Sequence, residues 1–149
     1  MKIALRGSKQ RLLTDGQYVG TSKCFQLLHM DLMGPVEVDS FSGKRYAYVV
    51  VDDFSRYTWI NFLKEKSETF GVLKTLHVSI LNLYGTSVLR IRSDHGTEFE
   101  NKSFADYCDV HGIFHEYSAP KTPKQNGIDE RKDRTLKEMA RVMINSMNV

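Results

Sequence analysis

The segment Tyr46–Val51 constrains the fold more than any other part of the chain, because it is nearly continuous apolar and β-branched. Such a run is typical of a central strand that is buried on both faces of a sheet. A second run, Tyr57–Leu63, follows the polar stretch DDFSR and predicts the partner strand of a hairpin. Both runs are far shorter than the roughly 18 residues that a membrane span needs, so we expect no membrane partner.

Apolar periodicity predicts the other elements of a layered α/β domain. Gly34-Pro35 ends the first strand, and Gly85 and Gly112 end two helices. The further strands are expected at Leu27–Leu32, Val88–Ser93 and Ile113–Tyr117, and the helices at Ser67–Tyr84, Ser103–His111 and Ile128–Met147. In the first helix, three- and four-residue spacing predicts a buried face of Phe70, Leu73, Leu76, Ile80, Leu83 and Tyr84. Three strands followed by helix–strand alternation predict a five-stranded mixed sheet flanked by helices.

Charge is distributed unevenly along the 149 residues, whose formal net charge is +3. Residues 1–25 carry five basic and one acidic residue, and residues 121–149 carry seven basic and four acidic ones. The intervening segment is net acidic, with thirteen acidic and nine basic residues. Basic segments favour polyanions such as nucleic acid, although solvated faces of an ordinary domain have the same composition. The two cysteines have neither a CxxC spacing nor a disulfide pattern, which indicates a reducing, intracellular setting.

Three carboxylates stand where the predicted elements would bring them to one crevice. Asp31 lies on the first predicted strand, Asp94 follows the fourth, and Glu130 begins the last helix. Sites in open α/β sheets form beyond the carboxyl ends of strands, and carboxylate oxygens are the ligands that Mg²⁺ and Mn²⁺ prefer. Taken singly, however, an Asp after a strand is typical of a turn, and a Glu in a first helical turn complements the helix dipole.

The sequence around these carboxylates resembles that of copia-type retrotransposon integrases. The resemblance lies in four blocks, which read LHMDLMGP from Leu28, YVVVDDFSRY from Tyr48, SDHGTEF from Ser93 and QNGIDER from Gln125. Thirty-five residues separate Asp94 from Glu130, which is the spacing of the Asp-Asp-Glu triad in that family. Within the second block, Asp52 and Asp53 match a strand-and-turn signature, so we interpret them as structural.

The resemblance implies a ribonuclease-H-like fold and an enzyme that joins DNA. Asp31, Asp94 and Glu130 then match the catalytic, metal-binding triad, with two divalent ions per active site, Mg²⁺ by preference or Mn²⁺. The implied reaction joins the 3′ ends of retroelement DNA to target DNA by transesterification. By the same resemblance the partners are both DNAs and further copies of the chain, with no small-molecule cofactor, and the protein acts in the nucleus and in virus-like particles.

The resemblance also suggests a division of the chain. We expect residues 1–24 to form a basic N-terminal arm or linker, and residues 25–149 to form an integrase catalytic core that is truncated at its C-terminal end. The family's N-terminal zinc module has no match here, because the zinc cysteines are absent. His111 and His115 are four residues apart, but Gly112 separates them, so we interpret them as ordinary surface or core histidines.

Basic residues near Glu130 predict a DNA-binding surface. Arg134, Lys137 and Arg141 fall on one narrow stripe with Glu130 if the last helix forms, and Lys121 and Lys124 lie in the preceding loop. A salt-bridged, solvated helix face is the alternative. Two other functions stay open: a ribonuclease-H-like nuclease, in which water attacks the phosphodiester, and a catalytically inactive integrase-derived module that binds DNA or another protein.

Overall fold

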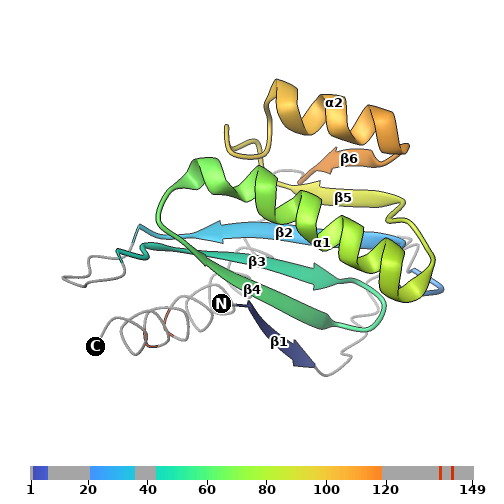
Figure 1. Cartoon of the computed structure of the whole chain (residues 1–149), viewed down its shortest axis with the longest axis horizontal. Coiled ribbons are helices and arrows are strands. Elements are labelled where there is room, and N and C mark those ends of the chain that lie inside the picture. Colours follow the sequence, from blue (N-terminus) through green and yellow to red (C-terminus); the bar gives the residue numbers. More distant parts are fainter. Residues whose placement is uncertain (1, 7–20, 36–42, 119–137, 139–141, 143–149) are drawn as a thin grey trace, which may run out of the picture.

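A six-stranded mixed sheet forms the centre of the computed structural model, which describes residues 2–6, 21–35, 43–118, 138 and 142 (Figure 1). The strands are β1 (Lys2–Arg6), β2 (Leu27–Met33), β3 (Tyr46–Asp52), β4 (Tyr57–Leu63), β5 (Arg90–Ser93) and β6 (Phe114–Tyr117). Their order across the sheet is β1-β4-β3-β2-β5-β6. Neighbours pair antiparallel from β1 to β2, and β5 pairs parallel with both β2 and β6. The five predicted strands are therefore confirmed.

The sixth strand, β1, differs from our expectation for residues 1–24. The backbone of Lys2–Arg6 pairs with β4, from Lys2 opposite Asn61 to Arg6 opposite Tyr57. Five residues are too few for periodicity to separate a strand from an arm, whereas the open edge of β4 offers a full row of unpaired backbone groups. We did not predict this strand, and the division of the chain at residue 25 stays a prediction.

Two α-helices in the described ranges cover one face of the sheet (Figure 1). A 3-10 turn, η1 (Lys66–Glu68), leads into α1 (Thr69–Tyr84). The second helix, α2 (Lys102–His111), is capped by Asn101, whose side chain accepts a hydrogen bond from the Phe104 N–H. Both helices end as predicted, at Gly85 and Gly112, whose φ angles of 65° and 66° are left-handed. None of the helices in the described ranges is long and apolar enough to cross a membrane.

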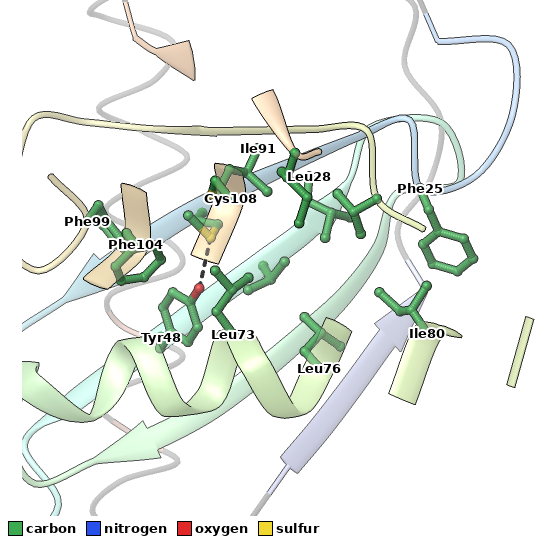
Figure 2. Packing of buried hydrophobic residues seen from close by; sticks show 14 of the residues in the cluster. Phe25, Leu28, Tyr48, Leu73, Leu76, Ile80, Ile91, Phe99, Phe104 and Cys108 are labelled. Carbon is green, nitrogen blue, oxygen red and sulfur yellow. Dashed lines mark hydrogen bonds between the residues drawn. The ribbon is translucent and has the colours of Figure 1, made fainter. Parts of the chain in front are cut away.

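The main hydrophobic core lies between the sheet and these helices (Figure 2). Leu73, Leu76 and Ile80 of α1 are buried there as predicted. Leu83 and Tyr84 are 76% and 61% exposed, so the prediction that they belong to the buried face is wrong. His77 is buried in their place. From α2, Phe104 and Cys108 complete the layer, and the Tyr48 hydroxyl of β3 donates a hydrogen bond to Met30 Sδ (2.9 Å).

The opposite face of the sheet is buried as well at its centre. Strand alternation turns Leu27, Ala47, Val49, Ile60 and Phe62 away from the α1 side, and all five are buried. A strand with core on both faces needs a continuous apolar run, which explains the composition of β3. The same alternation puts Asp31 on this second face, since its neighbours Met30 and Leu32 pack in or against the main core.

Candidate active site

The register of β2 and β5 bears on the first two predicted carboxylates, Asp31 and Asp94. The parallel pair of β2 and β5 sets Leu28 opposite Ile91 and His29 opposite Arg92. Extended by two residues, the same register sets Asp31 level with Asp94, which is the first residue beyond β5. Two residues at one level of a parallel pair point to the same face of a sheet. The continued register therefore predicts that Asp31 and Asp94 lie on one face near the carboxyl end of β5, although 63 positions separate them in the chain.

The loop after β5 fixes the side chain of Asp94. Asp94 Oδ1 accepts a hydrogen bond from the Gly96 N–H (2.8 Å), and the Gly96 carbonyl accepts from the N–H groups of Phe99 and Glu100. The carboxylate itself is exposed, whereas Ser93 immediately before it is buried. The strand end thus presents Asp94 to solvent in a defined orientation.

Asp52 and Asp53 act as structural residues in the β3–β4 turn, as we interpreted them. Asp52 is fully buried and accepts hydrogen bonds from the Phe25 N–H (2.9 Å) and from both the N–H and the hydroxyl of Ser55. Asp53 accepts from the Thr21 hydroxyl and lies 2.8 Å from His29 Nε2. Burial lowers the pKa of His29, against the opposing effect of Asp53. The turn is therefore tied to β2 two residues before Asp31.

A cationic cluster on β5 and β6 shares the face of Asp31. Glu116 pairs with Arg90 (2.9 Å) and with Arg92 (2.7 Å), and the three side chains together carry a net positive charge. Burial would raise the pKa of Glu116, but hydrogen bonds from Arg92 and Arg90 outweigh it and lower the pKa. This cluster was not predicted from the sequence, because its place on the face of Asp31 depends on the pairing of β5 with β2 and β6.

The remaining predicted site residues lie outside the residues that the structure describes. They are Glu130 of the triad and Lys121, Lys124, Arg134, Lys137 and Arg141 of the expected DNA-binding surface. Within the described ranges, no group of three or more His, Cys, Asp or Glu side chains is placed to hold a metal ion. Asp31 and Asp94 are nevertheless suitable in type as two ligands of a divalent cation, because both supply hard carboxylate oxygens and the continued register puts them on one face.

Residues 21–123 match the family model of the integrase core domain. The chain belongs to this family. It is 39% identical over 118 residues to the retrovirus-related Pol polyprotein from transposon TNT 1-94 of Nicotiana tabacum, and 35% identical over 134 residues to that from transposon RE2 of Arabidopsis thaliana. These alignments cover 79% and 88% of the chain but only 9% of each polyprotein. The chain thus corresponds to a small part of these two relatives, which are copia-type Pol polyproteins from plant transposons.

Solved structures share the fold of this integrase core. The catalytic core domain of BIV integrase aligns with a TM-score of 0.51 at 24% identity, covering 76% of this chain and 68% of that one. A simian T-cell lymphotropic virus intasome in complex with PP2A regulatory subunit B56 gamma aligns with a TM-score of 0.60 at 21% identity, covering 89% of this chain and 46% of that one. The expected ribonuclease-H-like fold is confirmed.

Proposed function

We propose that this integrase core is a metal-dependent polynucleotidyl transferase that joins the 3′ ends of retrotransposon DNA to target DNA. The observation that supports the proposal is the parallel register of β2 and β5, which would set Asp31 level with Asp94 if it continued two residues beyond His29 and Arg92. Membership of the integrase core domain family supports it. The partners are then the two DNAs and further copies of the chain, and the reaction takes place in the nucleus after assembly in a virus-like particle.

In this proposal, Asp31, Asp94 and Glu130 hold two divalent ions, Mg²⁺ or Mn²⁺. Bound there, such ions would stabilise the charge that develops on the attacking and leaving oxygens of a phosphodiester. The chain's own residues fix the ligand geometry, since the Gly96 N–H orients the Asp94 carboxylate. Arg92, on the face of Asp31, adds positive charge that attracts the DNA backbone. Lys121, Lys124, Arg134, Lys137 and Arg141 are proposed to contact DNA phosphates.

A strand-transfer assay on a branched oligonucleotide with Mg²⁺ or Mn²⁺ tests the proposal. Glu130→Gln keeps the size of the side chain but removes the charge, so activity should fall by several orders of magnitude while DNA affinity stays near that of the wild type. Asp94→Asn should do the same. Asp129→Asn is the matched control, because it is one residue away and would lie about 100° around the predicted helix, and it should retain most of the activity.

The products separate the proposal from its alternatives. Transesterification yields a strand in which parts of two reactant strands are covalently joined and releases the remaining part with a 3′-hydroxyl, whereas a nuclease yields only shortened strands. A folded wild-type protein that binds DNA but forms neither product would support the inactive module instead. If Asp129→Asn is inactive and Glu130→Gln is active, the third carboxylate is Asp129.

A further inference from the structure

A column of aromatic rings runs from the core to the surface beside Asp94. It starts at the fully buried Phe104 of α2, continues through His115 and Tyr117 of β6, and ends at His95. The ring centroids are 6.2, 4.5 and 4.4 Å apart along this series. Because β6 is the edge strand next to β5 and α2 lies beside β6 (Figure 1), these separate segments meet near the end of β5.

The outermost ring lies flat on its neighbour and is open to solvent. His95 stacks on Tyr117 with an interplanar angle of 14°, and its side chain is 64% exposed. With one face against Tyr117, the exposed surface belongs to the other face and the edges of the imidazole. Glu100 Oε2 lies 2.9 Å from His95 Nδ1 and fixes the rotation of the ring. Both partners are well exposed, so this pair orients the ring more than it stabilises the fold.

Hydrogen bonds link the column to the backbone of Asp94. The Ser93 hydroxyl donates its one hydrogen to the Asp94 carbonyl oxygen (2.9 Å). His115 Nε2 lies 2.8 Å from the same hydroxyl oxygen and is therefore the donor in that second hydrogen bond. The rings therefore keep a fixed position relative to the carboxylate. Adjacent Cα atoms are only 3.8 Å apart, so the ring of His95 starts one residue away from the proposed metal ligand.

We propose that the outer face of His95 is a stacking site for an unpaired DNA base next to the reacting phosphate. Aromatic side chains, histidine included, bind single-stranded nucleic acid by stacking on base faces, and every base has such a face. A paired base inside a duplex has both faces covered, so the ligand is a nucleotide at a frayed or overhanging end. The column favours this ligand because three rings beneath His95 hold it rigid. The inference rests on the proposed function and adds a base site to it.

Fluorescence of 2-aminopurine, an adenine analogue that is quenched by stacking, tests this site in the intact chain. One DNA carries the analogue in a short unpaired overhang, and a second carries it within a blunt duplex. With the wild type, the overhang analogue should be quenched further on binding. His95→Ala should abolish that change and weaken overhang binding roughly five- to tenfold, while blunt-duplex affinity is unchanged.

Two control variants distinguish the ring from the charge. His95→Phe keeps a flat ring but loses the pair with Glu100, and Glu100→Gln keeps His95, so both should retain the quenching. The site is overturned if His95→Ala quenches the overhang analogue as the wild type does, or if His95→Phe behaves like His95→Ala. Failure of the wild type to bind either DNA overturns the proposed function together with the site, whereas binding with no difference between overhang and blunt DNA overturns the site alone.

Discussion

Removal of the Asp52 carboxylate should destabilise the fold strongly, because this side chain joins two segments that are distant in sequence. Its oxygens accept hydrogen bonds from the Phe25 N–H before β2 and from the N–H and hydroxyl of Ser55 in the β3–β4 turn. Phe25 has a φ of 67°, a left-handed conformation that is costly for a residue with a side chain. The bond to Asp52 helps to hold it there.

The size of the effect follows from the exposure of the donors. Phe25 is buried, so its N–H would lose its partner without gaining water, at a cost of about 1–3 kcal/mol. Ser55 is partly exposed, so its N–H and hydroxyl would turn to water, at a cost of about 1 kcal/mol each. Asp52→Ala should therefore lower the free energy of unfolding by about 3–5 kcal/mol. Asp52→Asn keeps one acceptor oxygen and should lower it by about 1–2 kcal/mol.

Urea unfolding followed by circular dichroism measures both changes. Asp106→Ala is a control, because Asp106 is an exposed residue of α2 whose pair with Lys102 spans 3.8 Å, and it should change stability by less than about 0.5 kcal/mol. If Asp52→Ala unfolds within about 1 kcal/mol of the wild type, or if Asp52→Asn is as damaging as Asp52→Ala, the hydrogen bonds do not carry the stability that we assign to them.

Four further predictions address charge, pH and metal. Glu116→Gln should lower the free energy of unfolding in urea by about 1 kcal/mol at pH 7, because the lowered pKa of Glu116 makes the folded carboxylate stabilising above about pH 4.5. The difference from the wild type should disappear as the pH falls through the pKa of Glu116 in the folded state. Burial, and to a smaller extent the charge of His111, lower the pKa of His77, so protonation of His77 favours the unfolded state. The melting temperature should therefore decrease as the pH is lowered below about 6.5, and it should decrease less steeply in His77→Gln. Arg134→Ala and Lys137→Ala should each reduce the log–log salt slope of DNA binding by about one; unchanged slopes would favour the solvated helix face. Mn²⁺ should raise the melting temperature of the wild type and not of Asp94→Asn, and equal shifts would exclude Asp94 as a ligand.

Local sequence determined most of the secondary structure. Alternation and continuous apolar runs located β2 to β6 within two residues at each end, because a strand's periodicity is set by its own side chains. The glycines after α1 and α2 ended both helices as expected, since the left-handed caps need no distant contact. The interpretation of Asp52 and Asp53 as turn residues likewise depended on the few residues around them. The prediction that Leu83 is buried was wrong, because burial at the end of a helix depends on how far the neighbouring layer extends.

Only the tertiary structure decided which of these elements meet. The register of β2 and β5, from which we infer that Asp31 lies level with Asp94, is set by backbone hydrogen bonds between segments that are distant in sequence. No local pattern encodes it. The addition of β1 at the edge of β4 has the same origin. The stack of His95 on Tyr117 likewise depends on side chains from two strand ends. Residue type and spacing therefore supplied the chemistry of the site, and strand pairing supplied its geometry, because pairing depends on the whole sheet rather than on any one segment.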